Sequence, residues 1–181
     1  VRQLGLARGS SLRIWSAGSS TGEEAYSIAI TLARVVAERG LDLRMLATDI
    51  DTTVLAKGTR AVYPEAVLDD LPDPAMRAHF VEGTGQSQGM VRVRRELRER
   101  VRFHPLSFLA PRWPLRERFH VVFCRNALIY LAPEDQLATV RRLAAQVEPG
   151  GLLFLGHSES MIGMKASLDR VGVTAFRIGA S

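Results

Sequence analysis

The sequence predicts an α/β fold: a doubly wound, mostly parallel sheet with a small antiparallel β-subdomain inserted into it. Strand-like and helix-like segments alternate along most of the chain, and most of the strand-like segments are apolar throughout. Strands of that kind are buried on both faces, which is typical of a parallel sheet covered by helices on both sides. A third observation, the loss of this alternation between residues 64 and 105, indicates the insertion.

The first strand and helix are predicted on either side of a small-residue turn. Residues 12–17 have the pattern of a strand that runs into a glycine, serine and threonine turn at residues 18–22. Apolar residues then recur at helical spacing, at Ala25, Ile28, Ala29, Leu32, Val35 and Val36. Residues 43–47 fit a buried strand, and Asp51 is placed to cap the helix that follows it.

The second half of the chain continues the alternation. Residues 119–124 predict a strand, and residues 134–147 predict a helix that residues 149–151, Pro-Gly-Gly, should stop. Residues 152–155 again have strand character, and residues 171–178 predict a final strand, antiparallel at the edge of the sheet.

The insertion is predicted at about residues 83–103. It follows a proline-rich turn and a short helix near residues 75–80, and it contains valines that alternate with arginines, as in a half-exposed hairpin.

Composition favours one globular domain that spans residues 1–181. The apolar fraction of 46% argues against disorder. No apolar run approaches the roughly 20 residues of a membrane span, and no signal-peptide pattern is present. Cys124 is the single cysteine, so no internal disulfide can form, and a reducing cytoplasm is the expected compartment. We expect a monomer.

The net charge of +5 suggests an acidic partner, and much of the excess lies in residues 90–102. This arginine-rich run is either a solvated face or an electrostatic landing site, and the sequence leaves both open.

The turn after the first strand has the chemistry of a cofactor loop. Gly18 and its small neighbours let backbone N–H groups approach a ligand at the start of a helix. The loop is neither GxGxxG nor a P-loop, and Glu23 and Glu24 would repel a pyrophosphate but tolerate a cation such as S-adenosylmethionine (SAM). The alternative is purely structural: a capping box in which Glu24 bonds back to the N–H of Thr21.

Polar residues also follow two other strands. Asp49 lies after the second strand, at about the distance from the glycine turn at which an acid receives ribose hydroxyls. It could equally be a turn residue. Arg125, Asn126 and Tyr130 come after the strand at residues 119–124, where a substrate would lie, although Asn126 could simply cap a turn.

Taken together, these motifs resemble the CheR family of chemotaxis protein-glutamate methyltransferases. The resemblance rests on residues 12–18 with 20–24 and 26–29, on residues 47–51, on residues 123–126 through 129–130, and on residues 155–160, in the family's order and over nearly the whole chain. It implies the SAM-dependent methyltransferase form of the doubly wound sheet.

The same resemblance implies the site residues. It assigns the SAM site to Gly18, Glu24, Asp49, Ser107, Phe108, Arg125 and Asn126. It places Tyr130 beside the transferred methyl group, and it implies no metal and S-adenosylhomocysteine (SAH) as the product. We further expect Arg125 and Tyr130 to orient the acceptor. Ser107-Phe108 stands where the family usually has Asn-Leu, and Ala25 where it often has proline. The family's N-terminal helical domain, which closes over SAM, has no counterpart in these 181 residues.

The implied reaction is direct methyl transfer to a glutamate oxygen of a chemoreceptor's cytoplasmic domain. A glutamate with a pKa of about 4.3 is more than about 99% ionised at pH 7, so no general base is needed. His157 is therefore expected to be structural. The arginine-rich insertion is the expected docking surface for the glutamate-rich receptor.

Two rival functions follow from the same sequence. The basic charge suggests a nucleic-acid methyltransferase, but Cys124-Arg125-Asn126 is not the Asn/Asp-Pro-Pro-aromatic motif of amino-methylating DNA enzymes, and we expect no nucleic-acid partner. The absence of the helical domain and the presence of Ser107 instead suggest a non-catalytic module that binds SAM or SAH and signals by docking.

Overall fold

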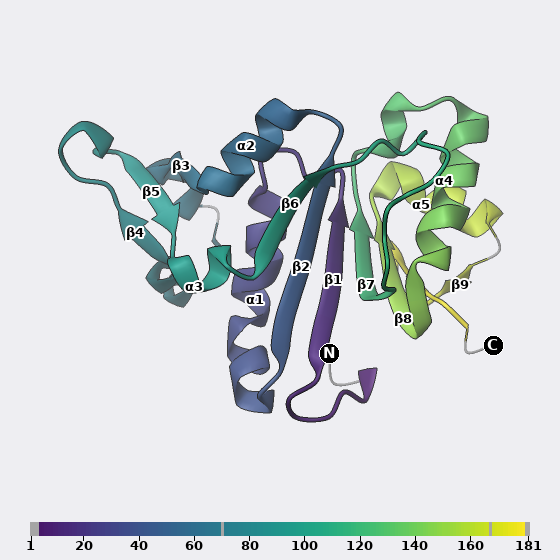
Figure 1. Ribbon diagram of the computed structural model, residues 1–181, viewed down its shortest axis with the longest axis horizontal. Coiled ribbons are helices and arrows are strands. Elements are labelled where there is room, and N and C mark those ends of the chain that lie inside the picture. Colours follow the sequence, from purple (N-terminus) through teal and green to yellow (C-terminus); the bar gives the residue numbers. More distant parts are fainter. Residues whose placement is uncertain (1–3, 70, 167, 180–181) are drawn as a thin grey trace.

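Seven strands form the main sheet in the order β6-β2-β1-β7-β8-β10-β9 (Figure 1). The computed structural model describes residues 4–69, 71–166 and 168–179. The strands are β1 (Ser11–Ala17), β2 (Asp42–Asp49), β6 (Val101–Pro105), β7 (Phe119–Cys124), β8 (Val147–Leu155), β9 (Asp169–Arg170) and β10 (Ala175–Arg177). The first five are parallel to one another, whereas β10 pairs antiparallel with β8 and β9. The predicted doubly wound, mostly parallel sheet is therefore confirmed.

Helices pack on both faces of this sheet. α1 (Glu23–Arg39) and α2 (Thr52–Arg60) contact β2 and β6, and α4 (Pro133–Ala145) and α5 (His157–Lys165) contact β8. Asp51 caps α2 as predicted, because its carboxylate accepts the N–H of Thr53. Gly40 ends α1 in the left-handed conformation.

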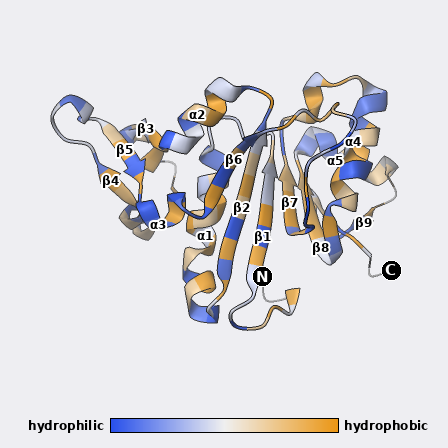
Figure 2. Ribbon diagram, in the orientation of Figure 1, coloured by the Kyte–Doolittle hydropathy of each residue, from blue (hydrophilic) through white to orange (hydrophobic). Residues whose placement is uncertain are grey.

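Two hydrophobic cores lie on opposite faces of the sheet. Leu12 and Ile14 of β1 pack with α1, whereas the alternate residues Trp15 and Ala17 pack with the residues under α4. In Figure 2 hydrophilic residues interrupt the otherwise apolar strands β1 and β2. The centre of the sheet is thus buried on both faces. This packing holds the carboxyl ends of the central strands in place.

The small antiparallel sheet has different boundaries from those predicted. Its strands are β3 (Val62–Pro64), β4 (Phe80–Glu82) and β5 (Met90–Val93), in the order β3-β5-β4. Short elements connect them: the 3₁₀ helices η2 (Glu65–Leu68), η3 (Pro74–His79) and η4 (Gly85–Ser87), followed by α3 (Arg95–Arg98). The insertion therefore begins earlier than residue 83, and it projects from one end of the molecule (Figure 1).

The end of the insertion was also placed wrongly, because β6 belongs to the main sheet. It pairs in parallel with β2, with Val101 opposite Met45 and Pro105 opposite Asp49. Val101 is buried, but Arg102 and His104 are exposed. This alternation mimics that of a hairpin strand, and only the long-range pairing with β2 distinguishes the two.

One face of the sheet is less covered than predicted. Among the described residues no helix follows β6 on the face opposite α1, and residues 106–118 cross there as an irregular segment (Figure 1). A groove of about 850 Å³ remains over β2 and β6, lined in part by Arg44, Arg102 and His104. Arg44 lies within residues 43–47, which were expected to form a buried strand, so its exposure could not be predicted from the sequence. Arg102 belongs to the arginine-rich run for which a solvated face was one of the two interpretations.

The remaining elements differ from prediction only in detail. α4 ends at Ala145, and β8 begins at Val147, so residues 149–151 lie within a strand and do not stop the helix. The final strand is shorter than predicted, because β10 spans only Ala175–Arg177. In the part of the chain that the structure describes, no helix is long and apolar enough to cross a membrane.

Candidate functional site

The carboxyl ends of the parallel strands meet at one edge of the sheet, at the top of Figure 1. The predicted site residues lie at or after the ends of these strands. Gly18 follows β1, Glu24 lies in the first turn of α1, and Asp49 ends β2. Ser107 and Phe108 follow β6, and Arg125, Asn126 and Tyr130 follow β7. Ligands of doubly wound folds bind at this edge. The strand order therefore assembles the site from loops that are far apart in the sequence.

The loop after β1 needs glycine at position 18. Gly18 has a φ of 79°, and a Cβ added there would lie 2.4 Å from the Cβ of Ala127 in the loop after β7. The N–H groups of Gly18 and Ser19 both donate to the carbonyl of Thr48, at 2.8 Å. The loops after β1, β2 and β7 are thus packed against one another at this residue.

Glu24 and Arg125 form an ion pair across the site. Glu24 Oε2 lies 3.6 Å from Arg125 Nη1, and Glu24 Oε1 accepts the hydroxyl of Ser16 at 2.8 Å. Burial raises the pKa of the Glu24 carboxyl above its ordinary value, and Ser16 and Arg125 oppose that shift. The capping box is wrong, because Glu24 bonds Ser16 and the N-cap of α1 is Gly22, without a side-chain cap bond.

Asp49 organises the glycine loop. Its Oδ2 accepts the N–H of Ser20 at 2.9 Å, and its Oδ1 accepts the N–H of Asp51 at 3.1 Å. Each carboxylate oxygen can accept two hydrogen bonds, so one position on each oxygen remains for a ligand. Asp49 is therefore a turn residue with capacity left for a diol, and the two interpretations of the sequence are compatible.

Ser107 and Phe108 lie in the loop after β6, and Phe108 approaches the glycine loop. The ring of Phe108 would lie 3.8 Å from a Cβ on Gly18. Ser107 accepts bonds from its own segment, through Oγ from the N–H of Leu109 and through its carbonyl from the indole of Trp113. Phe108 is thus brought to the glycine loop, whereas the Ser107 side chain is used locally.

Asn126 and Tyr130 are exposed at the rim. Asn126 adopts a φ of 56°, the left-handed region in which asparagine is one of the few tolerated residues. Tyr130 ends the 3₁₀ helix η5 (Leu128–Tyr130), and 84% of its surface is accessible. Both side chains are available to a ligand that approaches from solvent.

Sequence reasoning missed two residues at this edge. Ser16 binds Glu24 from within β1, and Glu159 is completely buried in the first turn of α5. The sequence contained Glu159 within a family motif, but nothing in its local pattern distinguished a buried carboxylate from an exposed one. His157, in contrast, is exposed at the start of α5.

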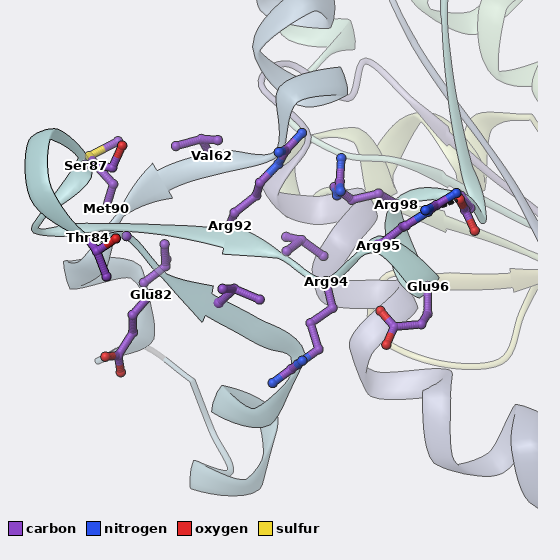
Figure 3. A pocket seen from close by; sticks show the side chains of 15 residues that line it. Val62, Glu82, Thr84, Ser87, Met90, Arg92, Arg94, Arg95, Glu96 and Arg98 are labelled. Carbon is purple, nitrogen blue, oxygen red and sulfur yellow. Dashed lines mark hydrogen bonds and ion pairs between the residues drawn. The ribbon is translucent and has the colours of Figure 1, made fainter.

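A second concave surface lies far from this edge, on the small sheet. It is a groove of about 880 Å³, which we call the arginine groove. Figure 3 shows its charged side chains, contributed by β4, β5 and α3: Arg92, Arg94, Arg95, Arg98, Glu82 and Glu96, with Glu99 also lining it. The Nε of Arg98 is buried and has no hydrogen-bond acceptor among the described residues.

The site at the strand ends fits a cationic adenosyl ligand such as SAM. Gly18 lets the loop after β1 pack closely against Ala127 of the loop after β7, Asp49 has acceptor capacity for a ribose, and the Glu24 carboxylate offsets the charge of Arg125 beside a cation. Within the described ranges no group of three His, Cys, Asp or Glu side chains is placed to hold a metal ion.

Comparison with known proteins agrees with this assignment. The family model described as "CheR methyltransferase, SAM binding domain" matches residues 2–177. The chemotaxis protein methyltransferase of Klebsiella aerogenes is 47% identical over 147 residues, which cover 81% of this chain and 51% of that protein. The corresponding protein of Escherichia coli K12 is 39% identical over 171 residues, which cover 94% of this chain and 60% of that protein.

Among solved structures, PKMT2 from Rickettsia typhi in complex with AdoHcy is 14% identical, with a TM-score of 0.48 over 80% of this chain and 20% of that one. The chain spans about half to three fifths of the length of the two curated relatives above. The family match, in contrast, extends over nearly all of the chain and includes every site residue described above. The chain therefore belongs to the CheR methyltransferase family, as its SAM-binding domain.

Proposed function

We propose that this domain transfers the methyl group of SAM to glutamate side chains of chemoreceptors and so forms glutamyl methyl esters. The observation that carries the proposal is the Glu24–Arg125 pair beside Asp49 at the strand ends, with Tyr130 exposed at the rim. SAM, when bound, supplies an electrophilic methyl group. The protein needs only to hold that group in line with a carboxylate that is already ionised at pH 7.

The residues divide this work between the cofactor and the acceptor. Asp49 accepts the ribose hydroxyls, and Gly18 and Phe108 bound the space beside them. Arg125, which is 51% exposed, presents its guanidinium to the incoming carboxylate while Glu24 anchors it from behind. An anionic acceptor is favoured over a neutral one, because the guanidinium can bind a carboxylate with two parallel hydrogen bonds.

The experiment is methylation of purified receptor cytoplasmic domains with labelled SAM, followed by alkali. A glutamyl methyl ester releases labelled methanol, whereas an N-methylated base does not. Labelled methanol from the receptor supports the proposal. Label that stays in nucleic acid would assign the rival methyltransferase activity, and SAH binding without transfer to any receptor would identify a non-catalytic module.

Tyr130→Phe should lower kcat by about threefold to tenfold and leave the KM for SAM unchanged. The Tyr130 hydroxyl reaches solvent at the rim, where it can donate one hydrogen bond to the acceptor, and one such bond contributes about 0.5–1.5 kcal/mol. Steady-state kinetics with saturating receptor measure the effect. Full kcat in the variant would show that this hydroxyl has no close role in transfer.

The arginine groove is the proposed docking surface for the receptor. Its arginines outnumber its glutamates, Glu99 is already paired with Arg95, and the buried Nε of Arg98 is a donor without an acceptor among the described residues. An acidic peptide segment would supply that acceptor. Docking here would leave the strand ends free for the acceptor glutamate, because the small sheet projects away from them (Figure 1).

We expect the single substitutions Arg94→Glu and Arg98→Glu each to weaken receptor binding by about tenfold at low salt. At 0.5 M salt the difference in affinity between each variant and the unmodified chain should shrink, because exposed charges are then screened. Titration calorimetry at two salt concentrations measures both quantities. Arg34→Glu, on the exposed side of α1, makes the same change in net charge outside the groove and should leave binding unchanged. Equal effects of all three variants would leave the groove as an ordinary solvated surface.

A further inference from the structure

The glycine loop of the cofactor site, residues 18–22, is held by hydrogen bonds from outside the loop. The N–H groups of its first three residues donate to the end of β2. Two of them donate to the carbonyl of Thr48, and the third, that of Ser20, donates to the carboxylate of Asp49. The fourth residue, Thr21, is held from a different part of the fold.

Tyr63 of the small antiparallel sheet supplies the contact to Thr21. Its hydroxyl donates to the carbonyl of Thr21 at 2.8 Å, between residues that lie 42 positions apart in the sequence. Tyr63 is a buried residue of β3, and it pairs with Val91 of β5, which lines the arginine groove. Burial is the main cause that raises the pKa of the Tyr63 hydroxyl, so this group stays protonated and remains a donor. The insertion thus reaches the cofactor loop through the side chain of Tyr63.

The backbone conformation of the loop explains why it needs such contacts. Gly18, Ser20 and Gly22 all have positive φ values, and the serine at 48° is strained there because it carries a Cβ. A strained residue keeps its conformation only where the surrounding structure holds it. Gly22, the N-cap of α1, makes no side-chain cap bond that could fix the end of the loop. Asp49 holds Ser20 itself, and Tyr63 holds the residue that follows it.

We propose that Tyr63 is a positioning residue for SAM binding, whose hydroxyl fixes the carbonyl of Thr21 and so keeps the loop in the conformation in which Ser20 donates to Asp49. The inference rests on the proposed function, because it concerns the same cofactor site. Asp49 is the proposed acceptor for the ribose hydroxyls, and its bond to Ser20 orients its carboxylate. Tyr63 is assigned no contact with the cofactor and acts through the loop.

The test is Tyr63→Phe, which removes the hydroxyl and keeps the ring. The ring packs edge-to-face against Tyr26, with 6.3 Å between the centroids, and this contact can remain in the variant. SAH binding to the 181-residue chain, measured by titration calorimetry, should weaken by about threefold to tenfold, as expected for the loss of one hydrogen bond. The amide hydrogens of residues 18–20 should also exchange with solvent faster in the free chain, because the loop opens more often. Mass spectrometry of peptides that contain the loop measures this exchange.

Tyr26→Phe is the matched control. The Tyr26 hydroxyl also donates to a backbone carbonyl, that of Gly58 in α2, at 3.0 Å. Both variants should lower the thermal midpoint by a similar small amount, because each leaves a carbonyl without this donor. Only Tyr63→Phe should weaken SAH binding and speed exchange in the loop, whereas a purely structural role of Tyr63 would change the thermal midpoint alone.

Three results would overturn the inference. Normal SAH affinity in Tyr63→Phe would show that binding does not depend on this hydroxyl. An equal loss of affinity in Tyr26→Phe would assign the effect to a general loosening of the aromatic contacts. Unchanged exchange at residues 18–20 would show that the loop keeps its shape without the bond. Failure of the unmodified chain to bind SAH or SAM would instead refute the proposed function, and the exchange comparison would still decide whether Tyr63 holds the loop.

Discussion

Asp49→Ala should weaken SAH binding by about 100-fold, the largest effect expected from any substitution at the site. The carboxylate accepts the N–H groups of Ser20 and Asp51, and it has the remaining capacity to accept two ribose hydroxyls. Hydrogen bonds to a charged acceptor contribute about 1.5–3 kcal/mol each. Losing roughly 3 kcal/mol of binding free energy in total corresponds to an affinity about 100-fold weaker. Titration calorimetry with SAH measures it without the need for a receptor.

Asp51→Ala is the matched control for Asp49→Ala. Asp51 carries the same charge two residues away, but its carboxylate caps α2 by accepting the N–H of Thr53. Its loss should lower the thermal midpoint modestly, because a capping bond is removed, and leave SAH affinity unchanged. If Asp49→Ala behaved in the same way, with lower stability and normal affinity, Asp49 would be a turn residue and nothing more.

Trp15→Ala should lower the free energy of unfolding by about 4 kcal/mol, as large aromatic deletions in a core do. Trp15 is completely buried, its ring centroid lies 5.4 Å from those of Trp113 and Phe119, and its indole N–H donates to Thr48 Oγ1 at 2.9 Å. The substitution removes the aromatic contacts and leaves the Thr48 hydroxyl without this bond. Because domains are stable by only about 5–15 kcal/mol, the loss is a large fraction of the total.

Urea unfolding followed by circular dichroism measures the effect of Trp15→Ala. Arg34→Ala is the control. The Arg34 side chain is 91% exposed and paired with Glu38, so its loss should change the free energy of unfolding by less than about 0.5 kcal/mol. Trp15→Ala should also weaken SAH binding secondarily, because Trp113 holds residues 106–118, which include Phe108. A loss below about 1 kcal/mol would mean that residues 106–118 collapse into the space and that this core is not tightly packed.

Local patterns predicted most of the elements correctly. The capping role of Asp51, the glycine turn at Gly18 and the strand at Phe119–Cys124 depend only on residues close in sequence, and all three are confirmed. The boundaries of the insertion, in contrast, depend on contacts between residues far apart in the sequence. Residues 101–105 alternate in burial as a hairpin strand would, and only their pairing with β2 assigns them to the main sheet.

The sequence predicted where the candidate site residues lie relative to the strands, but not the contacts among them. Glu24 and Arg125 were both expected there, yet their pairing, and the bond from Ser16 that replaces the capping box, come from the packing of α1 against the strand ends. Glu159 is the clearest omission. A glutamate in the first turn of a helix is ordinarily exposed and favourable there, and its burial depends on where α5 lies against β8 and the loop after β7.

The sequence by itself determined the alternation of strands and helices, the chemistry of each strand-end loop and the family, because these depend on residue types and their spacing along the chain. Only the tertiary structure decided which loops meet, which face of β2 and β6 stays open to solvent, and that Glu159 is buried with no hydrogen-bond donor among the described residues. The physical reason is that these properties follow from strand order and helix packing, which join residues far apart in the chain.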